Sequence, residues 1–140
     1  TNPARKPPRA FPVSPDGVER PPRNLVISSD VNHFITGRRT MLWTISCVDK
    51  PNTAAIREKV LVPHRDYLGS QKGILVLAGA TQNDDGTQAI GSLFVVNVDS
   101  RAKAKAFSDG DPFTQNGVFA SITITRMRKG QWNPGAAEGA

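Results

Sequence analysis

Apolar and polar residues alternate along residues 41–48, and the same period of two recurs along residues 89–98 and 118–125. Successive side chains of a strand point to opposite faces, so this period predicts three β-strands. Residues 74–78 form a short, continuous apolar run, which is typical of a buried strand. The chain is therefore expected to contain four strands.

The segment after the first strand has the period of a helix. Asn52 or Thr53 is a suitable N-cap for a helix over residues 54–71. Pro63 lies inside this helix and is expected to kink it. One stripe of the helix should face the sheet, because it carries residues spaced four apart: Ile56, Val60, His64 and Leu68.

A second, shorter helix is predicted between the third and fourth strands. Residues 101–108 are rich in Ala and Lys, Asp99 or Ser100 can cap them, and Gly110 can end them. The polar residues 81–87 are expected to form a turn that joins the second and third strands as an antiparallel pair.

The order of these elements predicts an α+β fold of the ferredoxin-like βαββαβ type. Its four-stranded antiparallel sheet would carry both helices on one face and leave the other face bare. Pairing with a second copy is the usual way to cover such a face, so a homodimer is expected. The bare face would carry one of the two alternating sets of side chains on the first and fourth strands, either the polar set or the apolar residues between its members. The polar set is Thr44, Ser46, Ser121, Thr123 and Thr125.

Residues 1–40 differ in composition from the rest of the chain. They contain most of the eleven prolines and carry seven Lys or Arg against three Asp or Glu, which accounts for +4 of the net charge of +6. This Pro/Arg-rich extension favours solvated backbone and is expected to be disordered or loosely docked. The folded domain is placed at residues 41–130, and residues 131–140 are expected to form a flexible tail.

The residues argue against several partners and cofactors. The positive charge lies mainly in the extension and lacks interleaved aromatics, so nucleic acid is not expected as the main partner, although binding through residues 1–40 stays open. No apolar run reaches the roughly 18 residues of a membrane span. The lone cysteine, Cys47, is typical of a reducing compartment, which favours the cytoplasm. Neither a metal-ligand spacing nor a phosphate-binding glycine loop is present, so no metal or other cofactor is expected.

His64 and Asp111 are the strongest candidates for chemistry. His64 lies on the stripe that faces the sheet, and Asp111 lies where the chain leaves the second helix, held extended by the proline after it. Taken separately, they are explained more simply as a core histidine and a turn or capping carboxylate. Because both helices share one face of the sheet, the two side chains can also meet. A carboxylate bound to one ring nitrogen would leave the other as a base directed at a pocket.

Two strand-end residues are further candidates. Ser92 opens the third predicted strand, which should lie beside the first, and its hydroxyl there would orient a ligand. A solvated serine at a strand end is the alternative. Gly79 follows the second predicted strand and would let a ligand approach the backbone closely, although an ordinary turn explains it as well.

A set of short stretches in residues 41–126 matches a known pattern. It comprises Met41-Leu42-Trp43 with Asp49-Lys50, Arg57, Pro63 and His64 ahead of Tyr67-Leu68, Gly79, Gly91-Ser92, and Asp111-Pro112-Phe113 with Gly117-Val118. Together these stretches resemble the YCII-related family. The resemblance implies a dimeric α+β barrel with a His–Asp dyad in a pocket, carried here by His64 and Asp111. It also implies substrate-binding roles for Ser92, Arg57, Gly79 and Phe113.

The resemblance further implies a small enzyme that needs neither metal nor nucleotide. Its dyad would perform general acid–base chemistry on a small cyclic organic substrate, such as isomerisation, lactone rearrangement or dehydrohalogenation. Proton transfer by a positioned histidine contributes ~10²–10⁴-fold in rate, which suits an activated ring. A non-catalytic ligand-binding or accessory module of the same fold is the competing interpretation, because it would keep the pocket without needing the base.

Overall fold

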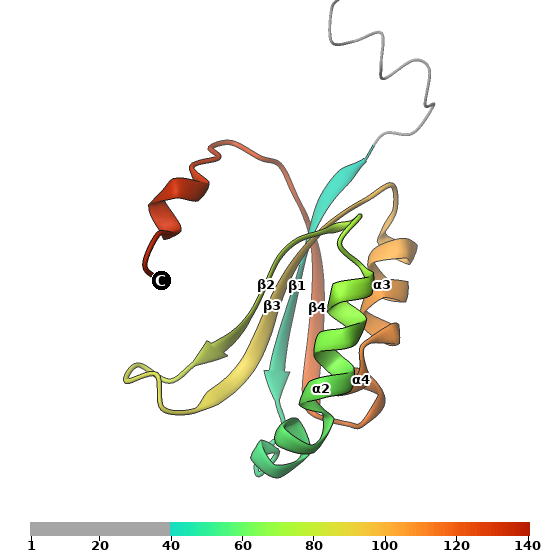
Figure 1. Ribbon diagram of the computed structural model, residues 1–140. Coiled ribbons are helices and arrows are strands. Elements are labelled where there is room, and N and C mark those ends of the chain that lie inside the picture. The colour runs from blue at the N-terminus through green and yellow to red at the C-terminus, as the bar shows by residue number, and fades with distance from the viewer. Residues whose placement is uncertain (1–39) are drawn as a thin grey trace, which may run out of the picture. The chain divides into compact units, whose positions relative to one another are not determined.

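A computed structural model describes residues 40–140 (Figure 1), so the predicted extension at residues 1–40 lies almost entirely outside the described residues. The strands are β1 (Met41–Asp49), β2 (Leu75–Gln82), β3 (Ala89–Val98) and β4 (Phe119–Met127). The helices are α2 (Ala54–Ser70), α3 (Arg101–Gly110) and α4 (Pro112–Gln115), and a 3-10 helix, η1, covers Pro134–Ala137.

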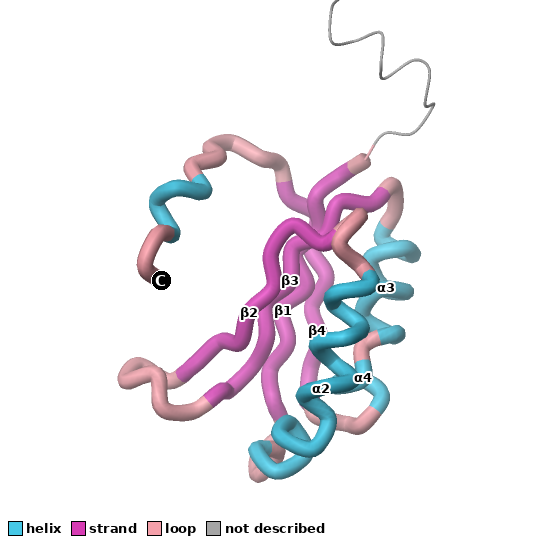
Figure 2. Tube along the Cα trace, in the orientation of Figure 1, coloured by secondary structure: helices cyan, strands magenta, loops and turns pink. Residues whose placement is uncertain are grey.

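The four strands form one antiparallel sheet in the order β2-β3-β1-β4. β1 and β3 lie side by side in its middle, as the sequence predicted. Figures 1 and 2 show α2, α3 and α4 together on one face of the sheet. The predicted ferredoxin-like α+β fold is confirmed. Within residues 40–140, no helix combines the length and the apolar character needed to cross a membrane.

The core lies between the sheet and the helices. Alternation along β1 and β3 directs every second side chain toward the helices, where burial of each large apolar group contributes about 1.5–3 kcal/mol. The opposite face carries the polar set of β1 and β4, with Thr44 opposite Thr125 and Ser46 opposite Thr123. The buried apolar residues are Trp43, Ile45, Cys47, Val60, Phe94, Val96, Val98, Ala104, Phe107, Phe113, Val118 and Phe119.

The turn between β2 and β3 is shorter than predicted. β2 continues to Gln82, which still pairs with Ala89 of β3. Asn83 then closes the turn, because its N–H donates to the Gln88 carbonyl (3.1 Å) and its side-chain oxygen accepts the Gln88 N–H (2.9 Å). The backbone bond and the side-chain bond, which the polar composition alone does not locate, together place the end of the strand.

The helix caps agree only in part with the predictions. Ser100 caps α3 by accepting a hydrogen bond from the Lys103 N–H (3.2 Å). Thr53 is the N-cap residue of α2, but its hydroxyl donates to the Lys50 carbonyl (3.0 Å) instead of accepting from the helix. α2 continues through Pro63 as one helix.

The short helix α4 was not predicted. Asp111 is its N-cap, accepting the Phe113 N–H (2.9 Å), and Pro112 takes the first helical turn, where the N–H that proline lacks is not needed. The Asp-Pro pair was therefore a signal for a helix start as well as for a turn. The tail predicted as flexible contains η1, whose residues are all exposed; its flexibility stays a prediction.

Replacing Gly91 by Ala is expected to destabilise the protein by about 1–3 kcal/mol. A Cβ at this position would overlap the backbone carbonyl of Cys47 and lie 2.6 Å from Thr81 Oγ1, so the middle strands would have to move apart. Urea unfolding measures the change. Gly79→Ala is the matched control in the neighbouring strand, because nothing lies within 4 Å of its Cβ. Equal stabilities of the two variants would contradict the argument.

Candidate active site

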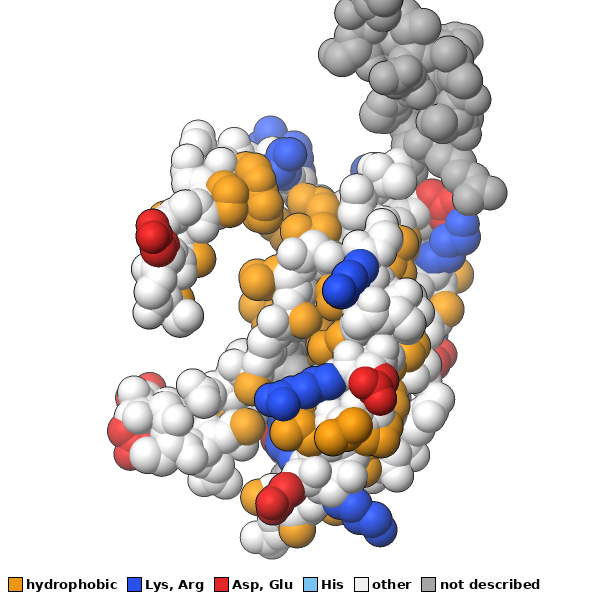
Figure 3. Space-filling view, viewed as in Figure 1, with side chains coloured by type: hydrophobic (Ala, Val, Ile, Leu, Met, Phe, Trp, Pro, Cys, Tyr) orange, Lys and Arg blue, Asp and Glu red, His pale blue; other side chains and the backbone are white. Residues whose placement is uncertain are grey.

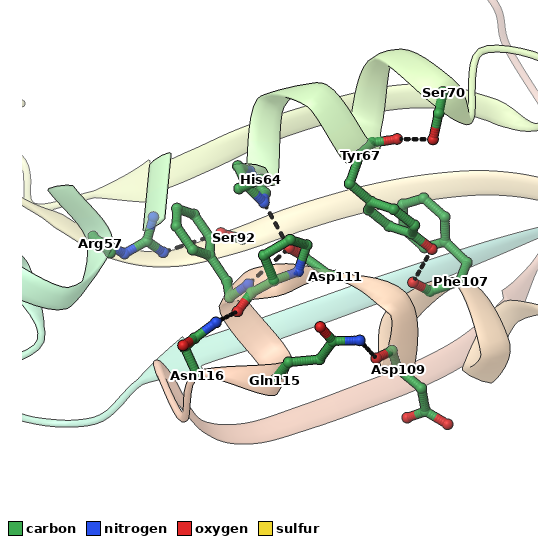
Figure 4. Close-up of polar contacts among 12 residues, drawn as sticks. Arg57, His64, Tyr67, Ser70, Ser92, Phe107, Asp109, Asp111, Gln115 and Asn116 are labelled. Atoms are coloured by element: carbon green, nitrogen blue, oxygen red, sulfur yellow. Dashed lines mark hydrogen bonds and ion pairs between the residues drawn. The ribbon is translucent and has the colours of Figure 1, made fainter. Parts of the chain in front are cut away.

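Two side chains from separate helical segments meet in the core. His64 projects from the middle of α2, and Asp111 stands between α3 and α4; Figure 4 shows them pointing toward each other. His64 Nδ1 lies 2.7 Å from Asp111 Oδ1, and Asp111 is only 1% exposed. The structure thus joins the two residues that the sequence singled out, while their catalytic role stays a prediction.

The carboxylate of Asp111 selects one form of the imidazole. An ionised carboxylate only accepts hydrogen bonds, so Nδ1 donates to it and Nε2 is the free acceptor of the neutral ring. The same oxygen, Oδ1, accepts the Phe113 N–H. Asp111 therefore caps a helix and contacts His64 at once, as both interpretations of this residue require, while its part in a catalytic dyad stays a prediction. Its Oδ2 has no hydrogen-bond partner among the described residues.

Two phenylalanines hold the imidazole in place. The Phe113 ring stacks on His64 with the centroids 3.8 Å apart and the planes inclined by 11°. Phe94 of β3 meets the same imidazole edge to face at 6.3 Å. Aromatic pairs of this kind contribute about 0.5–1.5 kcal/mol beyond their burial. Packing against the two phenylalanines therefore sets the plane of the imidazole, and the hydrogen bond to Asp111 sets which ring nitrogen carries the proton.

A second polar cluster is centred on Arg57 of α2. Its guanidinium donates to both oxygens of Asp49, from Nε (2.6 Å) and Nη2 (2.9 Å). Nη2 also contacts the Gly91 carbonyl (2.8 Å) and Ser92 Oγ (3.0 Å). The group lies over the Phe113 ring, with Cζ 4.8 Å from the centroid. The carboxylate of Asp49, whose side chain is 6% exposed, neutralises Arg57; no feature of the sequence indicated this pairing.

A cavity of about 310 Å³ opens beside His64. All four predicted substrate-binding residues line it, whereas Asp111 is behind the imidazole and acts on the cavity only through it. Phe94 and Ala80 were not predicted as site residues, because their only signal in the sequence was their place on the inner face of a strand. The lining residues are Arg57, Leu61, His64, Arg65, Leu68, Ala78, Gly79, Ala80, Ser92, Phe94 and Phe113.

Gly79 contributes to the cavity through its backbone. It pairs with Leu93 of β3, whereas the helix-facing Ser92 and Phe94 pair with Ala80 and Ala78. Side chains alternate along a strand, so a side chain at position 79 would point to the opposite face of the sheet. The absence of a side chain at position 79 therefore does not open the cavity side of the backbone, and a substrate-binding role for Gly79 stays a prediction.

Cys47 lies in the core near both carboxylates. Burial is the main cause that raises the pKa of its thiol from 9.0 to about 12, and the charges of Asp111 and Asp49 raise it further, against the opposing effect of Arg57. The thiol is therefore neutral and inert at neutral pH, as the sequence predicted. No three His, Cys, Asp or Glu side chains gather as a metal-binding group within residues 40–140.

The native Cys47 is expected to react with iodoacetamide roughly 10²–10³-fold more slowly than the unfolded chain at pH 9. The thiolate is the reacting form, and a raised pKa depletes it until the pH approaches the new value. Mass spectrometry of labelled protein, with and without guanidinium chloride, measures both rates. If the native chain were labelled as fast as the unfolded chain, the burial of the thiol in the core would be contradicted.

The fold and the site define a small α+β protein with an imidazole, fixed by a buried carboxylate, facing a partly open cavity. The profile of the YCII-related domain matches residues 41–128, and the chain belongs to this family. The match covers more than half of the chain and includes every residue of the site.

Among the solved structures that are similar over this domain is a dehydrochlorinase. It is the 5-chloro-2-hydroxyhydroquinone dehydrochlorinase from Burkholderia phenoliruptrix in complex with 2,5-dihydroxybenzoquinone, with 27% sequence identity and a TM-score of 0.58. The similarity covers 63% of this chain and 94% of the dehydrochlorinase. No curated protein sequence matches the chain.

Proposed function

We propose that this protein is a small-molecule enzyme that performs general acid–base chemistry on a small cyclic organic substrate, with dehydrohalogenation as the first reaction to test. The observation that carries the proposal is the buried 2.7 Å contact between His64 and Asp111 beside a cavity of about 310 Å³. A cavity of this size suits a single substituted ring. The similar dehydrochlorinase, which binds a quinone, supports the reaction class.

His64 is the base in this proposal. With Nδ1 donating to Asp111, Nε2 removes a proton from a hydroxyl or carbon of the bound ring. On a hydroquinone ring the imidazolium returns that proton to the carbon that carries the halogen, so that this carbon becomes tetrahedral and the deprotonated hydroxyl becomes a carbonyl. Loss of the proton of a second hydroxyl then forms a second carbonyl, the ring double bond shifts, and the halide leaves with its bonding pair, so that loss of HX balances without an oxidant. Asp111 stabilises the imidazolium that forms and keeps the ring in the reactive orientation.

Ser92 orients the substrate in this proposal. Its oxygen accepts a hydrogen bond from Arg57 (3.0 Å), and no hydrogen bond donated by its hydroxyl is found among the described residues. The hydroxyl proton is therefore free to bind an oxygen of the ligand. Arg57, neutralised by Asp49, holds Ser92 and strengthens it as a donor, because a cation that binds the oxygen polarises the O–H bond.

The test uses the full chain and 5-chloro-2-hydroxyhydroquinone. Release of chloride, followed with an ion-selective electrode, together with a quinone absorption band, is the expected result. Binding of 2,5-dihydroxybenzoquinone, measured by calorimetry, separates the alternatives, because binding without chloride release favours the ligand-binding module. If the chain neither binds this quinone nor releases chloride, the proposal is overturned for this substrate class.

We also propose that the protein acts in the cytoplasm as a homodimer. The lone Cys47 supports a reducing compartment, and the sheet face without helices supports association with a second copy. A fluorescent fusion expressed in the source cell tests the location, and a signal confined to any other compartment would contradict it.

A further inference from the structure

Arg65 lines the cavity beside His64 without a partner of its own. Its side chain is exposed, and among the described residues it makes no hydrogen bond and no ion pair. None of the residues three and four positions away on α2, which are the ones that can reach it along the helix, is acidic. The strand β2, which borders the cavity, carries no charged residue. The charge of Arg65 is therefore not neutralised by the chain.

The geometry of α2 places Arg65 at the mouth of the cavity. Each residue advances a helix by about 100°, so residues 65 and 67 point to nearly opposite flanks of α2. Tyr67 takes the flank toward α3, because its hydroxyl donates to the Phe107 carbonyl (2.7 Å). Arg65 therefore takes the other flank, toward the edge strand β2, whose residues 78–80 line the cavity. Basic side chains lie on the surface of the molecule that carries α2 (Figure 3).

Arg57, the other guanidinium on the cavity wall, is not available to an anion in the same way. Both oxygens of Asp49 accept hydrogen bonds from it, so this pair carries no net charge. The charge of Asp111 lies behind the imidazole in a side chain that is almost fully buried. Among the residues that line the cavity, Arg65 therefore presents the cationic group that a ligand can neutralise.

We propose that Arg65 makes the cavity selective for a ring that carries an anionic substituent, with a carboxylate as the group that fits it best. This inference rests on the proposed function, because it takes the cavity beside His64 as the substrate site. The planar guanidinium matches the two oxygens of a carboxylate, which adds direction to the attraction of opposite charges. A ring hydroxyl bound to Ser92 and a carboxylate bound to Arg65 would hold the ring from the sheet and from the helix. The substrate class is then a hydroxylated aromatic carboxylate that bears a leaving group.

The exposure of Arg65 sets the size of the expected preference. Water and salt weaken an exposed ion pair, and the ligand displaces only part of the water at the mouth of the cavity. At low salt, a ring with a carboxylate should therefore bind roughly tenfold more tightly than the same ring without the charge. The preference should shrink when salt is raised to about 0.5 M, because the Debye length then falls well below its value at low salt.

Calorimetry on the full chain compares two probes that differ by one charge, 2,5-dihydroxybenzoate and its methyl ester. The wild type should bind the carboxylate roughly tenfold more tightly. Arg65→Gln should remove this preference by weakening the carboxylate alone, and Arg65→Glu should reverse it. Unchanged binding of the ester by Arg65→Gln shows that this variant keeps the cavity. Lys59→Gln is the matched control, because it removes an exposed charge of α2 that does not line the cavity, and it should leave both affinities unchanged.

The inference is overturned if the wild type binds the ester as tightly as the carboxylate, if Arg65→Gln keeps the preference, or if the wild type binds neither probe. Chloride release from 5-chloro-2-hydroxyhydroquinone reports separately on the proposed function. Release without a preference for the carboxylate would overturn the charge selection alone. A preference without release would support the charge selection and favour the ligand-binding module over the enzyme.

Discussion

Replacing His64 by Gln is expected to reduce the rate of the proposed reaction by ~10²–10⁴-fold, which is the range that a positioned acid–base group contributes. Gln preserves a polar side chain on α2 but has no nitrogen that can take up a proton at neutral pH. Affinity for 2,5-dihydroxybenzoquinone should change little, because the cavity keeps Ser92, Phe94 and Phe113. Chloride release and calorimetry measure the two quantities separately.

The matched control is Asp66→Asn, which changes an exposed residue two positions along the same helix and should leave both quantities as in the wild type. A His64→Gln variant with full activity would remove the base from the mechanism. A variant that loses ligand binding and activity together would instead assign His64 to the wall of the cavity.

Asp111→Asn tests the carboxylate in the same dyad. An amide can present its NH₂ group to Nδ1, which would move the imidazole proton to Nε2 and abolish the base. The expected loss of activity is comparable to that of His64→Gln. Long-range ¹⁵N–¹H spectra of the imidazole distinguish the two tautomers, and an unchanged tautomer together with unchanged activity would show that Asp111 is only a helix cap.

Replacing Asp49 by Asn is expected to destabilise the protein by roughly 3 kcal/mol. The Asp49 and Arg57 side chains are only 6% and 12% exposed, and removal of one partner leaves the other charge buried without compensation, which costs about 3–5 kcal/mol in buried pairs. The lower value applies because the Gly91 carbonyl and Ser92 still accept from the guanidinium. Urea unfolding monitored by circular dichroism measures the loss.

Two further variants show whether the cost comes from the unpaired charge. Asp109→Asn breaks an exposed pair with Lys105, in which the side chains are 56% and 66% exposed, and should cost at most about 0.5 kcal/mol. Adding Arg57→Gln to Asp49→Asn removes the stranded charge and should recover most of the stability. A double variant no more stable than Asp49→Asn alone would place the effect elsewhere.

The sequence by itself determined the four strands, the two longer helices and their order. The alternation through Trp43, Ile45 and Cys47 requires a strand with one buried face, because side chains along a strand alternate between its two sides. The cap at Ser100 follows from a hydroxyl within reach of the next N–H groups. These features depend on neighbours within a few residues, so a local pattern contains the information that specifies them.

Only the tertiary structure decided which side chains meet. The 2.7 Å contact between His64 and Asp111 joins residues 47 positions apart, and no local pattern encodes that distance. It depends on how α2 and the start of α4 pack on the same sheet. The pairing of Arg57 with Asp49 and Ser92 likewise requires the helix to lie over the end of β1 and the start of β3. The packing of elements that are remote in sequence sets these distances, because the position of a side chain follows from the position of the helix or strand that carries it.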